Sequence, residues 1–112
     1  MKETLHESYK NQMRKGTLEL CTLLIIEKEK AYASKILKEL KASNLIVVEG
    51  TLYPLLSRLR SQELLKHSWE ESRSGPPRKY YELTTEGKKT LAQLKEVWID
   101  LVASINSLSK NS

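Results

Sequence analysis

The sequence of 112 residues contains one cysteine, no phenylalanine and no long run of apolar residues. A single thiol, Cys21, allows no disulfide within the chain. No apolar stretch approaches the roughly 20 residues of a membrane-spanning helix, and the first residues lack the apolar core of a secretory signal. We therefore expect a chain without a membrane span or an internal disulfide, located in the cytoplasm.

Motifs of enzymes and metal proteins are missing as well. The two histidines, His6 and His67, have no cysteine or acidic cluster at a metal-ligand spacing. There is no phosphate-binding loop, dinucleotide fingerprint or nucleophile elbow. Cys21 lies in an apolar block, which favours a small core residue over a nucleophile or redox sensor. The sequence thus predicts no catalytic site, no cofactor and no bound metal.

Positive charge is present in excess. Nineteen Lys and Arg against fourteen Asp and Glu give a net charge of +5. Residues 1–84 carry fifteen basic and eleven acidic residues, whereas residues 85–112 carry four and three. Charge alone is weak evidence for nucleic-acid binding, because many soluble domains carry solvated lysines; the placement of the cations has to decide.

One short segment, residues 51–61, has the pattern of a helix with a single buried face. Its four leucines recur at i, i+3, i+4 and i+7. The remaining positions hold small, hydrogen-bonding or cationic side chains, which suit base edges and phosphates. From this helix we expect DNA contacts by Thr51, Tyr53, Pro54, Ser57, Arg58 and Arg60.

Two strand-like runs, Leu64–Glu70 and Arg78–Leu83, follow this helix and predict a hairpin. The connection between them includes Gly75, Pro76 and Pro77, and we expect its tip to contact DNA through Arg73, Arg78 and Lys79. Strand alternation predicts Tyr81 in the core with Leu83, and Tyr80 outside. Trp69 alternates with Leu65 and His67, so we expect it to pack the hairpin against the body.

Three further helices are predicted before this unit. Thr4 and Glu7 have the spacing of a capping box, so a helix begins at Leu5. The apolar block 18–26 predicts a second helix, separated from the first by Gly16. Ser34 is the expected cap of a third helix, in which Ile36, Leu37 and Leu40 point inward. Because two helices followed by a basic hairpin are typical of a winged helix-turn-helix, the DNA-contacting set also includes Ser34 and Lys35.

The last predicted helix carries an apolar seam. Leu91, Leu94, Trp98, Leu101, Ile105 and Leu108 follow one another at steps of three and four. A second copy of the chain would cover such a seam; alternatively, the seam closes back on its own domain. The residues expected at a dimer or effector interface are Leu5, Tyr9, Met13, Leu94, Trp98, Leu101 and Ile105.

Trp98 is an unusual residue to pack in a tight interface between two helices. Its indole is large and carries an N–H that needs a partner, so a pair of such rings at a two-fold axis would make a wall for a planar hydrophobic molecule. The other interpretation is that Trp98 only packs the dimer.

Three segments of the sequence resemble a known family. Gly50-Thr51-Leu52-Tyr53, followed at this distance by Gly75-Pro76-Pro77-Arg78-Lys79-Tyr80-Tyr81-Glu82-Leu83-Thr84-Thr85-Glu86-Gly87, strongly resembles the PadR family of bacterial transcriptional regulators. Lys15-Gly16-Thr17-Leu18-Glu19-Leu20 resembles its first-helix segment, and the short final helix resembles its smaller subfamily. The resemblance implies a dimeric winged helix-turn-helix repressor, with the region of Thr51, Tyr53 and Arg58 in DNA. Glu63 departs from the pattern, since many members have a glycine there.

The predicted fold is mainly α with a small β-hairpin wing. We expect one compact unit, with a winged helix-turn-helix DNA-binding domain in residues 1–84 and a C-terminal dimerisation helix in residues 85–112. The predicted function is a transcriptional regulator that binds a pseudo-palindromic operator as a homodimer, acts as a repressor and is released by a small-molecule effector. The alternative is a winged-helix module that binds another protein, with the cations serving only solubility.

Overall fold

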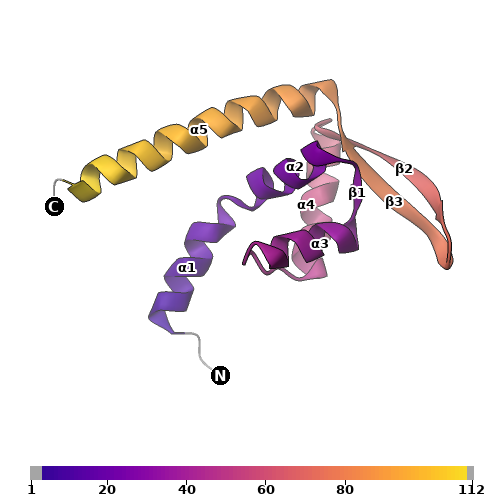
Figure 1. Cartoon of the computed structure of the whole chain (residues 1–112), viewed down its shortest axis with the longest axis horizontal. Coiled ribbons are helices and arrows are strands. Elements are labelled where there is room, and N and C mark those ends of the chain that lie inside the picture. The colour runs from indigo at the N-terminus through magenta and orange to yellow at the C-terminus, as the bar shows by residue number, and fades with distance from the viewer. Residues whose placement is uncertain (1–3, 111–112) are drawn as a thin grey trace.

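A computed structural model describes residues 4–110 of the chain. In chain order the elements are α1 (Leu5–Lys15), α2 (Leu18–Lys28), β1 (Ala31–Tyr32), α3 (Ala33–Ala42), α4 (Glu49–Ser61), β2 (Leu65–Ser72), β3 (Gly75–Leu83) and α5 (Thr85–Lys110). The strands form one antiparallel sheet in the order β1-β3-β2. The hairpin β2–β3 projects at one end of the molecule and α5 runs toward the other (Figure 1). The predicted fold class is therefore confirmed.

The leucine face of α4 forms the centre of the core. Its four leucines are no more than 3% exposed, and they pack in one cluster with side chains from α2, α3, β2, β3 and α5. Ile36 and Leu40 of α3 are buried, as predicted, and Leu37 packs at the edge. Tyr81 and Leu83 are buried while Tyr80 is only partly so, which confirms the predicted alternation in β3. The helix α4 begins at Glu49, two residues earlier than expected.

The start of α1 is confirmed and the start of α3 is corrected. The Glu7 amide donates to Thr4 Oγ1 over 3.1 Å, so Thr4 caps α1. Ser34, however, does not cap α3, because the helix begins at Ala33 and Ser34 lies within its first turn. The entry to α3 is fixed instead by the two-residue strand β1, which pairs with Tyr80 and Tyr81 of β3. A strand this short leaves no periodic signal in a sequence.

The hairpin is longer and its turn tighter than predicted. Ser72 pairs with Gly75, so only Arg73 and Ser74 lie between the strands. Pro76 and Pro77, expected in the loop, belong to β3, beside a register irregularity between Glu70 and Ser72. Proline has no N–H to donate, and a strand tolerates it where the ladder is already interrupted. The Ser72 hydroxyl donates to the Pro76 carbonyl over 2.9 Å and closes the turn.

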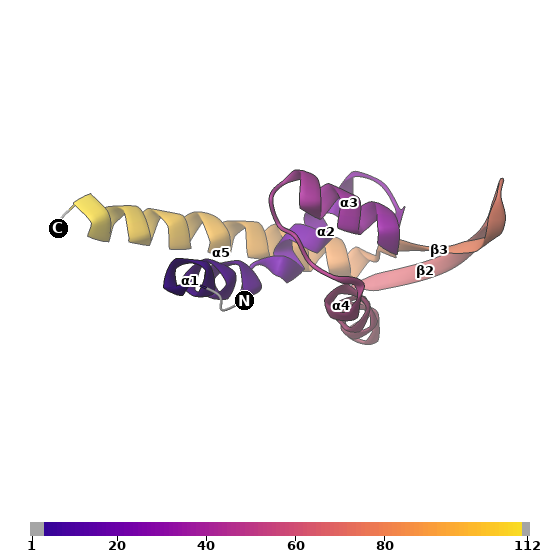
Figure 2. The same ribbon diagram turned by 90° about the horizontal axis from the view of Figure 1, so that it is seen from below.

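Trp69 does not pack against the body. Leu65 at the base of β2 is buried, but Trp69 is 64% exposed, so the predicted role of Trp69 is wrong. A strand rises about 3.3 Å per residue, which carries Trp69 roughly 13 Å beyond Leu65. The tip of the hairpin projects beyond the helices (Figures 1 and 2), and Trp69 lines an open hollow with Ser34 of α3 and Tyr53 of α4 instead of packing in the core. The alternation correctly predicted on which face of the hairpin Trp69 lies. It did not predict how far along β2 the core extends.

The departure at Glu63 leaves the end of α4 intact. Glu63 adopts φ 63°, in the left-handed region where a glycine would be relaxed. The Glu63 amide donates to the Arg60 carbonyl over 2.9 Å, and the Leu64 amide donates to the Leu59 carbonyl over 3.0 Å. These two bonds satisfy carbonyls in the last turn, the arrangement known as a Schellman motif.

A tight junction joins the end of α4 to the start of α5. The Thr84 hydroxyl donates to the Glu63 carbonyl over 2.6 Å and accepts from the Gly87 amide over 2.9 Å. The Thr84 amide donates to the Leu64 carbonyl over 3.1 Å. Gly87 is buried so close to this carbonyl that a Cβ on it would lie 2.1 Å from the Leu64 oxygen. Only glycine fits without moving the backbone.

Replacing Gly87 with alanine is therefore expected to lower the free energy of unfolding by about 3 kcal/mol, since the added methyl overlaps a backbone carbonyl. Gly50→Ala is the matched control, because Gly50 also lies in the first turn of a helix and has open space around it. That change should raise stability by up to about 1 kcal/mol. Urea unfolding of both variants measures the difference; equal stabilities would contradict the close approach.

Candidate nucleic-acid interface

The exposed side of α4 consists of three strips. Buried leucines fix the helix rotation, and at 100° per residue Pro54 and Ser57 then lie near the middle of the exposed face. Arg58 lies on one flank, toward α2. Tyr53 and Arg60 lie on the other flank, where they line hollows formed with the hairpin. The small central residues let a partner approach closely, while the larger donors stand on both sides.

Arg58 is held toward α2 by an acidic neighbour. Its guanidinium forms an ion pair with the carboxylate of Glu19, and both side chains are about half exposed. An exposed pair of this kind contributes little to stability, about 0–1 kcal/mol. It does determine where the guanidinium lies when no partner is bound. Sequence patterns did not indicate Glu19, because the contact joins residues 39 positions apart.

Arg78 and Lys79, which the sequence grouped together, lie on opposite faces of the hairpin. Arg78 has its guanidinium 4.4 Å from the centre of the Tyr32 ring. Lys79 has its ammonium 5.9 Å from the centre of the Trp69 ring. Adjacent residues of a strand point to opposite faces, so both positions follow from the register. Arg73 is exposed in the turn itself.

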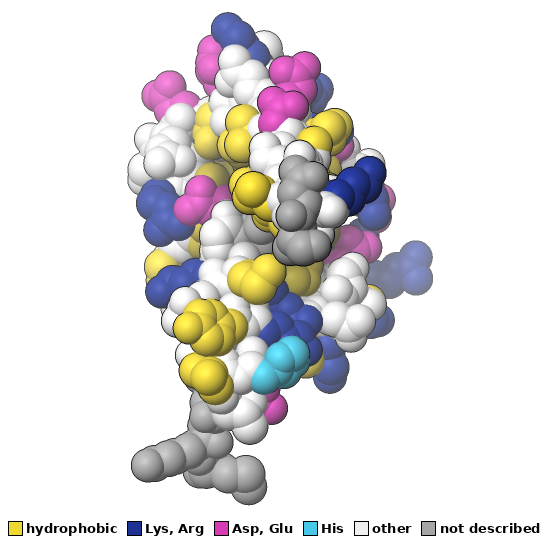
Figure 3. Space-filling model, turned by 90° about the vertical axis from the view of Figure 1, so that its left-hand side faces the viewer, with side chains coloured by type: hydrophobic (Ala, Val, Ile, Leu, Met, Phe, Trp, Pro, Cys, Tyr) yellow, Lys and Arg dark blue, Asp and Glu magenta, His cyan; other side chains and the backbone are white. Residues whose placement is uncertain are grey.

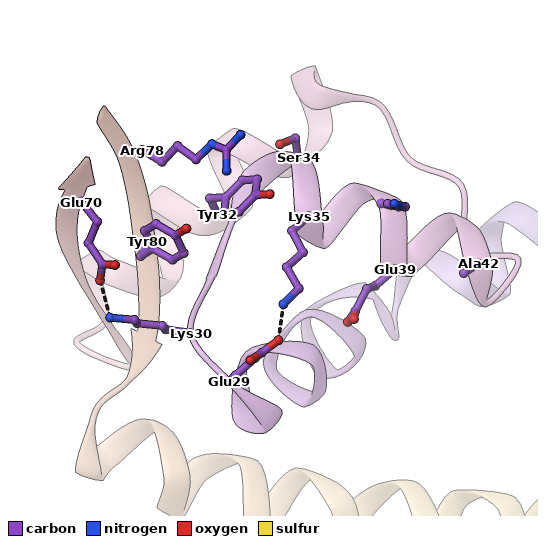
Figure 4. A pocket seen from close by; sticks show the side chains of 11 residues that line it. Glu29, Lys30, Tyr32, Ser34, Lys35, Glu39, Ala42, Glu70, Arg78 and Tyr80 are labelled. Atoms are coloured by element: carbon purple, nitrogen blue, oxygen red, sulfur yellow. Dashed lines mark hydrogen bonds and ion pairs between the residues drawn. The ribbon is translucent and has the colours of Figure 1, made fainter. Parts of the chain in front are cut away.

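The face of the hairpin that carries Arg78 is braced by aromatic and ionic contacts. Tyr32 and Tyr80 meet edge to face, with ring centres 5.3 Å apart at 77°. Lys30 forms an ion pair with Glu70 and lies 5.6 Å from the Tyr80 ring centre. These side chains border an open hollow of about 840 Å³ beside α3 (Figure 4). We call it the outer hollow.

Lys35 and Ser34 differ in their surroundings. Lys35 points into the outer hollow and forms an ion pair with Glu29, which raises the pKa of Lys35 and lowers that of Glu29 (Figure 4). Its charge is thus already compensated within the protein. Ser34 is exposed at the start of α3 and lines hollows on both sides of the hairpin.

A second hollow, which we call the inner hollow, lies between α4, the start of α3 and the other face of the hairpin. It measures about 320 Å³, and Tyr53, Trp69 and Lys79 contribute to its lining. Nearby, partial burial and the charges of Arg60 and Lys79 lower the pKa of His67. This side of the hairpin is therefore electropositive. Sequence analysis missed Trp69 as a surface residue because its alternation with Leu65 implied burial.

The described residues offer little for catalysis. Burial raises the pKa of the Cys21 thiol, only partly offset by a hydrogen bond with Thr17, so the reactive thiolate is disfavoured. Residues 4–110 hold no group of three or more histidine, cysteine or acidic side chains arranged to bind a metal. Within the same range, no helix is both long and apolar enough to cross a membrane.

The apolar seam of α5 is buried only at its beginning. Leu91 is buried and Leu94 partly so, whereas Trp98 is 44% exposed, and Leu101, Ile105 and Leu108 are exposed too. Beyond Leu94 the seam does not close back on the domain. On α1, Leu5, Tyr9 and Met13 are exposed as well. Apolar side chains gather at this end of the molecule, away from the hairpin (Figure 3).

Known proteins resemble this chain over most of its length. The model of the transcriptional regulator PadR-like family matches residues 22–93. A PadR-like transcription factor from Bacteroides fragilis is similar at 52% identity, with 90% of this chain and 98% of that chain covered and a TM-score of 0.75. A PadR family transcriptional regulator from Eggerthella lenta is similar at 34% identity, with 94% and 92% covered and a TM-score of 0.85. A PadR-like transcriptional regulator from Bacillus cereus is similar at 38% identity, with 87% and 95% covered and a TM-score of 0.77.

The pair of Arg58 and Glu19 generates a prediction about DNA affinity. Arg58→Ala is expected to weaken specific binding by about 1 to 3 kcal/mol, because the contact that we expect between its guanidinium and DNA is lost. Glu19→Gln should strengthen binding about two- to fivefold, because it frees Arg58 and removes a negative charge. Fluorescence anisotropy with operator DNA at one salt concentration measures both. If Arg58→Ala lowers the melting temperature and leaves affinity unchanged, Arg58 is structural and does not contact DNA.

Proposed function

Because this chain belongs to the transcriptional regulator PadR-like family, we propose that it is a dimeric repressor that binds a pseudo-palindromic operator and is released by a small molecule. Membership confirms the resemblance carried by the segments at residues 50–53 and 75–87, and it classes the chain as a transcriptional regulator rather than an enzyme. The repressor role, the operator and the effector go further and are argued below.

The observation that carries DNA binding is the polar face of α4 beside an electropositive hairpin. A buried leucine face sets the rotation of α4, so small and hydrogen-bonding side chains must face outward. Arg58 and Arg60 flank this face, and Lys79 extends it onto the hairpin. A helix of this kind fits the major groove, and a basic hairpin fits the adjacent phosphate backbone.

The uncovered seam of α5 supports a homodimer. Trp98, Leu101 and Ile105 are exposed along one helix, with the exposed apolar residues of α1 at the same end of the molecule. A second copy covers such a stripe with its own equivalent under two-fold symmetry. The dimer then presents two copies of α4, and two equivalent readers require two half-sites related by the same symmetry.

Trp98 supports release by a ligand. In a two-fold dimer its indole lies beside its own mate or its mate's neighbours, and its half-exposed ring is available to a flat hydrophobic molecule. A ligand that binds better to a dimer with the two α4 helices misplaced for the operator shifts the population away from DNA. The competing interpretation, that Trp98 only packs the dimer, predicts no ligand.

The rival function is a winged-helix module that binds another protein. The salt dependence of the binding affinity distinguishes the two functions. Mapping the chain's binding sites across its own genome supplies the operator. The operator affinity of the dimer should then fall about a thousandfold between 50 and 200 mM salt, because several phosphate contacts release counterions. If no genomic site is enriched, and the chain instead binds another protein with an affinity that does not depend on salt, the interaction module is favoured.

A fluorescence titration tests the effector site. The chain has two tryptophans, so Trp69→Phe leaves Trp98 as the reporter. Planar hydrophobic compounds should quench it saturably, and the same compounds should release the wild-type chain from its operator. Trp98→Ala is the companion variant. If it dissociates the dimer and no compound quenches saturably, Trp98 is a packing residue and the ligand site is abandoned.

A further inference from the structure

Trp69 is a large apolar side chain that lies mostly exposed on the surface. It is 64% exposed, far out on β2, and its register partner across the hairpin is Lys79. The Lys79 ammonium lies 5.9 Å from the indole centre and 5.6 Å from the Tyr81 ring centre. Indole and ammonium therefore stand together on the face of the hairpin that turns toward α4.

The inner hollow lies between the two elements expected to meet DNA. Tyr53 contributes from α4, Ser34 from the start of α3, and Trp69 and Lys79 from the hairpin. When a helix occupies the major groove and a hairpin reaches the neighbouring groove, the backbone strand that separates the grooves passes between them. The inner hollow occupies that position.

Charge distinguishes the inner hollow from the outer one. The outer hollow is lined by three carboxylates together with four cations: Glu29, Glu39, Glu70, Lys30, Lys35, Lys38 and Arg78. No acidic side chain of the described residues lines the inner hollow, and its polar groups include the ammonium of Lys79, the indole N–H of Trp69 and the phenol of Tyr53. A hollow with donors and no carboxylate suits an anion better than the outer hollow, where carboxylates offset most of the positive charge.

We propose that the inner hollow holds one backbone phosphate and its deoxyribose, with Trp69 as the residue that seats them. The indole face covers the apolar side of the sugar, and the indole N–H donates to a phosphate oxygen. Lys79 neutralises the phosphate, and the Tyr53 hydroxyl donates to it from α4. Trp69 thereby fixes the position of the hairpin on DNA without reading bases. This inference rests on the proposed function, because it names a contact within the DNA interface.

A duplex of mixed sequence tests the contact, because phosphate and sugar contacts are independent of sequence. With a labelled duplex of about 30 base pairs, Trp69→Ala should weaken binding roughly tenfold, as expected for a lost hydrogen bond to a charged group and lost packing. Trp69→Phe keeps the packing and loses the N–H, so its affinity for the duplex should lie between that of the wild-type chain and that of Trp69→Ala. Unchanged melting temperatures would show that both variants fold.

Lysines on the two faces of the hairpin provide a matched pair. Lys79→Ala should reduce the salt slope of the dimer by about 1.8, since each of the two protomers loses one phosphate contact, worth about 0.9. Lys66→Ala removes the same charge from the opposite face of β2, where Lys66 pairs with Glu82, and should leave the slope unchanged. Equal slopes for both variants would overturn the assignment of the inner face.

Acrylamide quenching supplies a direct readout. DNA should protect the wild-type fluorescence from acrylamide, and Trp69→Phe should abolish most of this protection, because Trp98 lies away from the hairpin. If the wild-type chain binds the duplex but Trp69→Ala binds as tightly and DNA protects no tryptophan, the Trp69 contact is wrong while DNA binding stands. If the wild-type chain binds no DNA at any salt concentration, the proposed function fails and this inference fails with it.

Discussion

The junction at Thr84 is the constraint on which the arrangement of the molecule depends. One threonine hydroxyl bonds the carbonyl at the end of α4 and the amide in the first turn of α5, and its own amide bonds Leu64. The hairpin leaves and returns at the same point, since Leu65 pairs with Leu83. Helix α4, the hairpin and α5 therefore all meet at one set of backbone contacts. Gly87 makes this geometry attainable, because no side chain separates the two backbones.

This junction also determines how the two ends of the molecule can communicate. The exposed part of the seam and the tip of the hairpin lie at opposite ends of a molecule 55 Å long. A shift of α5 in a dimer cannot be absorbed by a loop at its base, since Thr84 ties its first turn to the end of α4. The leucines of α4 and Leu91 of α5 belong to the same buried cluster. Movement of the seam should then reorient α4 nearly as a rigid body, and the proposed release by a ligand requires a discrete coupling of this kind.

Much of this arrangement could be predicted from the sequence, and the failures share a cause. The leucine spacing in α4, the Thr4 cap and the alternation of Tyr80 and Tyr81 are local patterns, and each was confirmed. The two-residue strand β1 and the pairing of Glu19 with Arg58 depend on contacts between distant segments, so no local pattern contains them. Trp69 lay on the predicted face but beyond the end of the core. Its exposure reflects an open hollow between the hairpin and the helices α3 and α4, which no local sequence pattern contains.

The cations illustrate the same distinction between composition and placement. Lys30 and Lys35 each have a carboxylate partner on the α3 side of the hairpin, and Lys95 is paired with Glu27. Among residues 4–110, Arg60, Arg73 and Lys79 form no ion pair within the protein. A net charge of +5 could be spread evenly and attract any anion weakly. Here carboxylates offset most of the positive charge in the outer hollow, whereas no carboxylate lines the inner hollow. A phosphate group is thus favoured more strongly in the inner hollow, and this preference depends on where the acidic residues lie as much as on the basic ones.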